Sequence, residues 1–182
     1  MTQPAASSYT AAFDAAVAEV LRAEGKYQND PKDRGNWTGG AVGVGVNKGT
    51  NWGISAAKYP TLDIRTLSRE DAIAIYHRDY WQPVRGDEIP YRIALVLFDI
   101  QVNGGHPVKW LQQTLGVAAD GVFGPATLAA VRNAADPKAL VGRILRRRVL
   151  YYTTLGTFAD YGPNWVQRSF DLHRTALEAT LP

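Results

Sequence analysis

The chain has 182 residues, of which 46% are hydrophobic and 20% are charged. This balance excludes wholesale disorder and allows one domain, or one domain with a small appended module. The absence of cysteine excludes disulfides, thiol nucleophiles and cysteine-bound zinc. Residues 1–100 hold 11 Lys and Arg against 12 Asp and Glu, whereas residues 101–182 hold 9 against 5, so the second half suggests an anionic partner.

The segment YTAAFDAAVAEVLRAEG predicts a helix, because its apolar residues recur every three or four positions, as at Val17 and Val20. Glu24 lies four residues after Val20 and should project from the same apolar face. Gly25 predicts the end of the helix. A segment rich in Gly, Asn, Asp and Thr follows at residues 27–55, and its AVGVGV run predicts a short strand in a small hairpin.

Two further helices are expected in the first half. TLSREDAIAIYHRDYW has Ser68 as a predicted N-cap, with Asp71 as its capping-box partner. PYRIALVLFDIQVN is apolar nearly all round, which predicts a central buried helix ending at a Gly-Gly pair. Asp99 and Asn103 interrupt this helix, and polar groups in a buried helix need a partner or a function.

The second half predicts further helices joined by turns. PVKWLQQTLG places Pro107 in a first helical turn, and VAADGVFGPATLAAVRNA reads as a turn followed by a short helix. DPKALVGRILRRRVLYYTTL predicts a longer helix with a basic cluster at residues 146–148. The picture is mainly α, with one small β region close to the first carboxylates.

The position of Glu24 favours a chemical role over that of a solvated surface charge. A carboxyl lined by apolar groups holds its proton more tightly, because desolvation disfavours the charged form. Such a group can protonate a leaving glycosidic oxygen, and cleavage then also needs a second carboxylate or a positioned water. Asp33, nine residues later, is the main candidate for that carboxylate, with Asp99 as a second. Asp30 stands in an Asn-Asp-Pro turn signature, which favours a structural role.

Aromatic rings and amides near these carboxylates are candidates for binding sugars. Aromatic faces stack on sugar rings, and amides bond to hydroxyl or acetamido groups, although core packing is the competing explanation for each tryptophan. The candidate substrate-binding residues are Tyr27, Asn29, Trp37, Asn51, Trp52 and Asn103.

The runs EGKYQNDPKDRGN, GTNWGIS and FDIQVNGG together resemble glycoside hydrolase family 108, the N-acetylmuramidases found as phage endolysins and bacterial secretion-associated lysins. LQQTLGVAADGVFGPATLAAV and the helices after it are similar to the predicted peptidoglycan-binding region of that family. The resemblance implies a mainly α, α+β lysozyme-like fold: a helical bundle with one small β-hairpin near the N-terminal active site. It divides the chain into a catalytic domain at residues 9–105 and a helical peptidoglycan-binding region at residues 106–182.

The implied activity is hydrolysis of the β-1,4 bond between N-acetylmuramic acid and N-acetylglucosamine in peptidoglycan. The family's catalytic Glu-Gly-Gly-Tyr motif begins at Glu24, with Lys26 in place of the second glycine. The wider group of phage lysozymes adds an aspartate nine residues on and a threonine. These fall on Asp33 and on Thr50, with Thr38 as the alternative threonine.

We expect peptidoglycan as the partner of a monomeric chain, with no cofactor and no metal, since the three histidines form no paired ligand motif. Nucleic acid is not expected, because the basic residues follow no reading motif. Residues 138–155 are basic and amphipathic and could contact anionic outer-membrane lipid.

The first residues lack the features of a secretory signal. The expected location is therefore the host bacterial cytoplasm, with release to the wall through a holin-type pore. Three alternatives stay open: a non-catalytic peptidoglycan-binding protein, a lytic transglycosylase, and a glucosaminidase.

Overall fold

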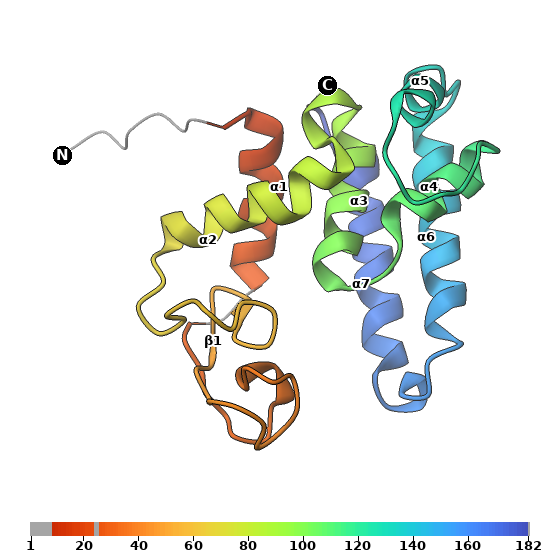
Figure 1. The fold of residues 1–182 in the computed structure, drawn as a ribbon. Helices are drawn as coiled ribbons and strands as arrows, with labels where there is room; N and C mark the ends of the chain where they lie inside the picture. Colours follow the sequence, from red (N-terminus) through yellow and green to blue (C-terminus); the bar gives the residue numbers. More distant parts are fainter. Residues whose placement is uncertain (1–8, 24–25, 182) are drawn as a thin grey trace. The chain divides into compact units, whose positions relative to one another are not determined.

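The computed structural model describes residues 9–23 and 26–181 (Figure 1). These residues form two compact units, which we call the loop unit (Asp14–His77) and the helical unit (residues up to Phe13 together with those from Arg78 onward). The α-helices are α1 (Ala11–Ala23), α2 (Arg69–Tyr76), α3 (Tyr91–Asn103), α4 (Pro107–Leu115), α5 (Pro125–Arg132), α6 (Pro137–Tyr152) and α7 (Phe158–Glu178).

Two helices of the loop unit begin and pack as their sequences predict. In α1, Val17 and Val20 are buried, which confirms its apolar face. The hydroxyl of Ser68 accepts a hydrogen bond of 3.0 Å from the backbone N–H of Asp71, so the predicted N-cap of α2 is confirmed. Both features are local, because each depends on residues within one or two helical turns.

The β structure of the loop unit is smaller than expected and lies elsewhere. Strands β1 (Thr50–Asn51) and β2 (Ile54–Ser55) pair antiparallel around a two-residue turn. The prediction of a strand at AVGVGV is wrong: residues 41–46 form turns and bends. Its three valines are 52–60% exposed, so no second layer covers them, and glycines between them adopt positive φ.

The helical unit is built around α3. Nine of its thirteen residues are buried, as the nearly continuous apolar sequence predicts, and α4, α6 and α7 pack against it. Phe13, Trp81 and Phe98 form an aromatic cluster within this unit, with ring centroids 5.5–6.2 Å apart. Figure 1 shows α6 and α7 running side by side, in agreement with their extensive contact.

The mainly α fold is thus confirmed, and the small hairpin is its β component. The expected boundary between residues 105 and 106 stays a prediction, since α3 shares its compact unit with the helices that follow it. Across residues 9–23 and 26–181, no helix combines the length and apolarity that crossing a bilayer would require.

Candidate active site

The predicted catalytic loop is organised around the β1–β2 hairpin of the loop unit. Trp52 and Gly53 form its turn, with φ values of 52° and 76°. Two consecutive positive φ values match the twist of a tight hairpin. A positive φ is nevertheless rare for a residue as bulky as tryptophan. The hydroxyl of Tyr76 donates a hydrogen bond of 3.1 Å to the carbonyl of Trp52, which helps to hold the turn in this conformation. Backbone strain of this kind is concentrated at functional sites.

The chain segment after α1 lies beside this hairpin. The backbone N–H of Gln28 donates to the carbonyl of Thr50 at 2.9 Å, and the N–H of Thr50 donates back at 2.8 Å. Residues next to the predicted catalytic glutamate are thereby fixed to the strand that carries Thr50.

The carboxylate of Asp33 is held in one orientation. Asp33 is the N-cap of a short 3-10 helix, Arg34–Asn36, and its Oδ1 accepts a hydrogen bond of 2.8 Å from the N–H of Gly35. Its Oδ2 accepts a hydrogen bond of 3.1 Å from the side-chain amide of Gln28. Asp33 is nevertheless an exposed residue, although its carboxylate is held by two hydrogen bonds.

Asn36 connects this carboxylate to Thr50. Asn36 is fully buried, and its Oδ1 accepts hydrogen bonds from the hydroxyl of Thr50 at 2.7 Å and from the amide of Gln28 at 3.1 Å. Its Nδ2 donates to Gln28 Oε1 at 2.8 Å and to the carbonyl of Asp30 at 3.0 Å. Asp33 and Thr50, predicted separately, therefore belong to one hydrogen-bond network that runs through Gln28 and Asn36.

Sequence reasoning missed Gln28 and Asn36. Two signals were present: Gln28 directly follows Tyr27, and Asn36 stands three residues after Asp33 in a loop with few apolar residues. A polar loop needs internal hydrogen bonds to keep a fixed shape, and side-chain amides can donate and accept at once.

Glu24 and Gly25 lie outside the described residues, so the acid predicted at Glu24 stays a prediction. The described chain resumes at Lys26, whose side chain is exposed. Asp30 behaves as its turn signature predicts, because its Oδ1 accepts a hydrogen bond of 2.9 Å from the N–H of Lys32.

Comparison with known proteins shows the family of the chain. The family model described as glycosyl hydrolase 108 matches residues 17–105, and one described as a predicted peptidoglycan domain matches residues 106–168. A solved structure described as Brucella abortus SagA is 31% identical, with a TM-score of 0.75, and the match covers 91% of this chain and 93% of that one. The chain belongs to the glycosyl hydrolase 108 family. No curated protein matches it.

Membership of the glycosyl hydrolase 108 family, together with the peptidoglycan domain, makes the chain a peptidoglycan-degrading glycoside hydrolase. The resemblance noted in the sequence is confirmed. Peptidoglycan is accordingly its substrate.

The candidate sugar-binding residues of this glycosyl hydrolase 108 chain occupy different environments. Tyr27 and Asn29 line an open pocket in the loop unit. Trp37 is partly buried, and its indole N–H donates to the carbonyl of Pro31 at 3.0 Å. Trp52 is partly buried in the hairpin turn. Substrate contact by these four residues stays a prediction.

Asn51 and Asn103 make structural hydrogen bonds. Asn51 is 7% exposed, and its Nδ2 donates to the carbonyls of Ile64 and Leu67, both at 3.2 Å, which fixes the chain before α2. Asn103 belongs to the helical unit, where its amide donates to the carbonyl of Asp99 at 2.9 Å. Sugar binding by either residue stays a prediction, and the burial of Asn51 favours a structural role.

Asp99 is the centre of a buried ion-pair cluster in the helical unit. Its Oδ1 accepts a hydrogen bond from Arg148 at 2.7 Å, and its Oδ2 accepts one from Arg168 at 2.6 Å. Arg148 is completely buried, and its guanidinium also lies over the ring of Tyr152, whose pKa is raised by burial. Both carboxylate oxygens of Asp99 are thus bonded to arginine, which suits a role in joining α3 to α6 and α7.

The DGVFGPAT motif of the peptidoglycan-binding region folds around one buried amide. Gln112 donates from Nε2 to Asp120 Oδ1 at 2.7 Å and to Thr127 Oγ1 at 3.0 Å, and its Oε1 accepts from the N–H of Gly121 at 2.8 Å. The side chains of Asp120 and Thr127 and the backbone of Gly121 thus bind the loop between α4 and α5 to Gln112.

The basic cluster at residues 146–148 does not form one cationic face. Arg148 is buried against Asp99, and Arg147 bonds to Thr114 and Gln113 of α4. Of these three arginines, only Arg146 is exposed. Consecutive residues on a helix point about 100° apart, so three neighbouring arginines cannot share a face.

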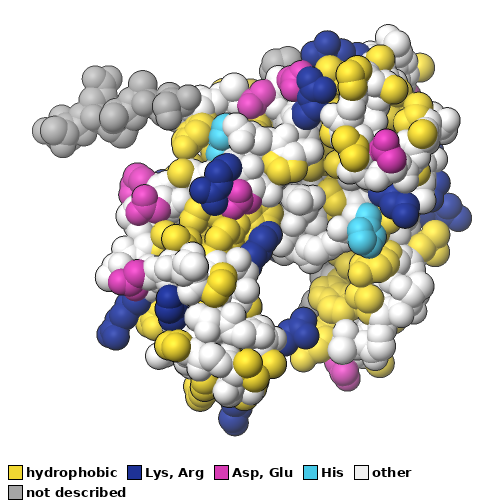
Figure 2. Space-filling view, in the orientation of Figure 1, with side chains coloured by type: hydrophobic (Ala, Val, Ile, Leu, Met, Phe, Trp, Pro, Cys, Tyr) yellow, Lys and Arg dark blue, Asp and Glu magenta, His cyan; other side chains and the backbone are white. Residues whose placement is uncertain are grey.

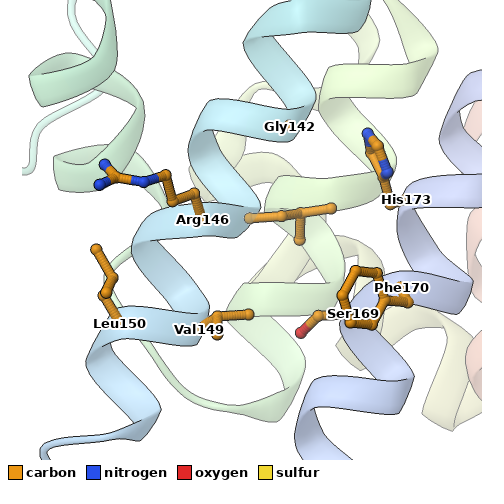
Figure 3. A pocket seen from close by; sticks show the side chains of 8 residues that line it. Gly142, Arg146, Val149, Leu150, Ser169, Phe170 and His173 are labelled. Atoms are coloured by element: carbon orange, nitrogen blue, oxygen red, sulfur yellow. The ribbon is translucent and has the colours of Figure 1, made fainter.

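An apolar groove of about 310 Å³ lies between α6 and α7 (Figure 3). Val149, Phe170 and His173 extend into it, whereas the guanidinium of Arg146 points away from α7. Leu150 is 50% exposed and Phe170 is 65% exposed, and Figure 2 shows hydrophobic side chains gathered over this part of α6 and α7. Contact with anionic outer-membrane lipid stays a prediction.

Proposed function

We propose that the chain is an N-acetylmuramidase that hydrolyses the β-1,4 bond between N-acetylmuramic acid and N-acetylglucosamine. The observation that supports this most is the network joining Asp33 to Thr50 through Gln28 and Asn36, in the loop that directly follows Glu24. It fixes a carboxylate and a hydroxyl beside the segment that carries the expected acid.

In the proposed mechanism, Glu24 protonates the glycosidic oxygen. Asp33, an exposed residue, then positions a water or stabilises the oxocarbenium-like transition state. Thr50 has its hydroxyl proton committed to Asn36, which leaves its oxygen lone pairs to accept a hydrogen bond from that water. Gln28 and Asn36 are positioning residues, because they hold Asp33 and Thr50 and need not touch the sugar.

The biological setting that we propose is that of an endolysin, which lyses a host cell from within after a holin-type pore opens the way to the wall. The presence of a hydrolase region and a peptidoglycan domain in one chain supports this, because wall attachment keeps such an enzyme on its polymer. The test is to express the chain with and without a pore-forming protein. Lysis only with the pore-forming protein would agree with this setting, and lysis without it would contradict it.

The test of the reaction is digestion of purified peptidoglycan, followed by borohydride reduction and mass spectrometry of the soluble fragments. We expect reduced muramic acid ends from the wild type and none from Glu24→Gln. Glu19→Gln is the matched control, because Glu19 is an exposed glutamate of α1, paired with Arg22. It should retain full activity.

The same digest separates the alternatives. Anhydromuramic ends would identify a lytic transglycosylase, and reduced glucosamine ends would identify a glucosaminidase. Bound but undigested polymer would identify a non-catalytic binding protein. Each of these three results would overturn the muramidase proposal.

A further inference from the structure

The loop unit contains an open pocket of about 370 Å³ beside Tyr27. Its walls come from three separate segments: residues 27 and 29, residues 47 and 48, and residues 61–65. The pocket is polar, with two amides, one carboxylate, one guanidinium and one ammonium among its lining side chains. It therefore suits a charged, hydrogen-bonding ligand better than an apolar one.

Hydrogen bonds hold these walls in place. The ammonium group of Lys48 donates to the carbonyls of Pro60 at 2.7 Å and Leu62 at 3.2 Å. Asn47 Nδ2 donates to the carbonyl of Asn29 at 3.1 Å. Lys48 thus uses its charge to fasten one wall to another, and the pocket is formed before any ligand arrives.

Arg65 supplies the cation that is free to bind a ligand. Its guanidinium carbon lies 5.8 Å from the ring centroid of Tyr27, and its side chain is exposed. In the part of the chain that the structure describes, no carboxylate forms an ion pair with Arg65. A guanidinium held over an aromatic ring keeps its in-plane N–H groups available, and their fork matches a carboxylate.

Asp63 lines the same pocket and, among the described residues, has no cationic partner either. The pocket therefore presents the carboxylate of Asp63 together with two cations, Arg65 and the carbonyl-bonded Lys48. The sugar units of peptidoglycan carry no charge on their rings once the lactyl group is joined to peptide. The charged groups of the polymer are the carboxylates and amines of its stem peptides, so the charges of the pocket point to the peptide.

We propose that this pocket binds the peptide stem of peptidoglycan. The guanidinium of Arg65, which lies over the ring of Tyr27, binds a carboxylate of the stem. The proposal rests on peptidoglycan hydrolysis as the proposed function, and it adds a determinant of substrate choice. Arg65 makes the enzyme prefer glycan that carries peptide over bare glycan. Asp63 favours a stem that also carries an amine.

The experiment compares two substrates made from one preparation: intact sacculi, and the same sacculi stripped of their stems by an amidase. The readout is kcat/KM for the release of new reducing ends. We expect Arg65→Ala to lower kcat/KM on stem-bearing wall about tenfold or more, the usual effect of losing a charge-assisted bond, with little change on stripped glycan. Arg65→Lys should fall between, because it keeps the charge and loses the fork.

Arg69→Ala is the matched control, because Arg69 is an exposed arginine four residues later that lies outside the pocket. It should leave the ratio of the two rates unchanged. Equal losses on both substrates with Arg65→Ala, or no loss on either, would overturn the proposal.

A binding measurement distinguishes failure of the pocket assignment from failure of the proposed muramidase function. The probes are a soluble stem-bearing glycan fragment and its stemless counterpart, titrated into Glu24→Gln and into Glu24→Gln/Arg65→Ala. If Glu24→Gln binds the stem-bearing probe more tightly and Arg65→Ala abolishes this difference, the pocket assignment is supported. This holds even if the wild type proves to cleave another bond. Equal affinity for the two probes before the Arg65 change overturns the assignment even if the wild type is a muramidase.

Discussion

The hydroxyl of Thr50 donates a hydrogen bond of 2.7 Å to the side-chain oxygen of Asn36, a fully buried residue. The same oxygen accepts from Gln28, which also bonds to Asp33. One asparagine thus joins the carboxylate and the hydroxyl that the sequence assigned to catalysis.

Asn36→Ala should therefore disrupt both the loop and the reaction. It removes four side-chain hydrogen bonds and leaves buried polar groups unsatisfied, so we expect the free energy of unfolding to fall by about 2 kcal/mol or more. Urea unfolding checks the stability, and the peptidoglycan digest checks the activity, which should fall at least tenfold. Asn164→Ala, at an exposed site in α7, is the control and should change neither. Unchanged activity in Asn36→Ala would contradict a positioning role.

Gly49→Ala should destabilise the loop through a steric clash. Gly49 has a φ of 84°, and an added Cβ would lie 2.5 Å from the carbonyl oxygen of Gln28 and 2.7 Å from the ring of Tyr27. We expect a loss of about 2–4 kcal/mol, from the left-handed backbone and from overpacking together. Gly40→Ala is the matched control, because Gly40 has a φ of 73° and open space around it. It should lose only about 1 kcal/mol. Equal losses by thermal unfolding would rule out the clash.

Asp99→Asn should be strongly destabilising, because it leaves the completely buried Arg148 without its carboxylate. Removing one partner of a buried ion pair costs about 3–5 kcal/mol. The same change at Asp171, whose pair with Arg174 is exposed, should cost less than about 1 kcal/mol. Adding Arg148→Met to Asp99→Asn should recover part of the loss in a denaturant titration. No recovery would show that the buried charge is not the cause.

Asp120 should give the helical unit a stability that depends on pH. Hydrogen bonds from the N–H of Val122 and the amide of Gln112 lower the pKa of this carboxyl below its ordinary value of 3.8. The unfolded chain therefore binds this proton first as the pH falls. The stabilisation is complete well above pH 3.8 and is lost as the pH falls through the lower folded pKa.

Comparison of wild type with Asp120→Asn isolates this effect, because asparagine does not titrate. The difference in unfolding free energy should be constant above about pH 5 and shrink as the solution is acidified. Asp160→Asn, an exposed change in the first turn of α7, is the control. A difference that grows on acidification would contradict the assigned sign.

Local sequence predicts most of the helices. Ser68 caps α2, Pro107 begins α4, and the apolar run of α3 becomes a buried helix, because capping, proline geometry and hydrophobic periodicity act within a few residues. The AVGVGV run shows the limit of this approach. Its composition suits a strand, but the valines stay exposed and the segment makes only two backbone hydrogen bonds to Thr38 and Gly39, which do not form a regular ladder.

The sequence by itself determined the helical framework and the family resemblance, because these depend on residue types in a local pattern. It also predicts Asp33 from its spacing to Glu24 and Thr50 from the resemblance. Only the tertiary structure decided that Gln28 and Asn36 link these two residues, that Arg148 is buried against Asp99, and that Arg65 lies over Tyr27. Each of these contacts joins residues well separated along the chain or depends on a loop conformation that no local periodicity specifies. Hydrogen bonds and charge pairing between such residues form only once the backbone has brought them together.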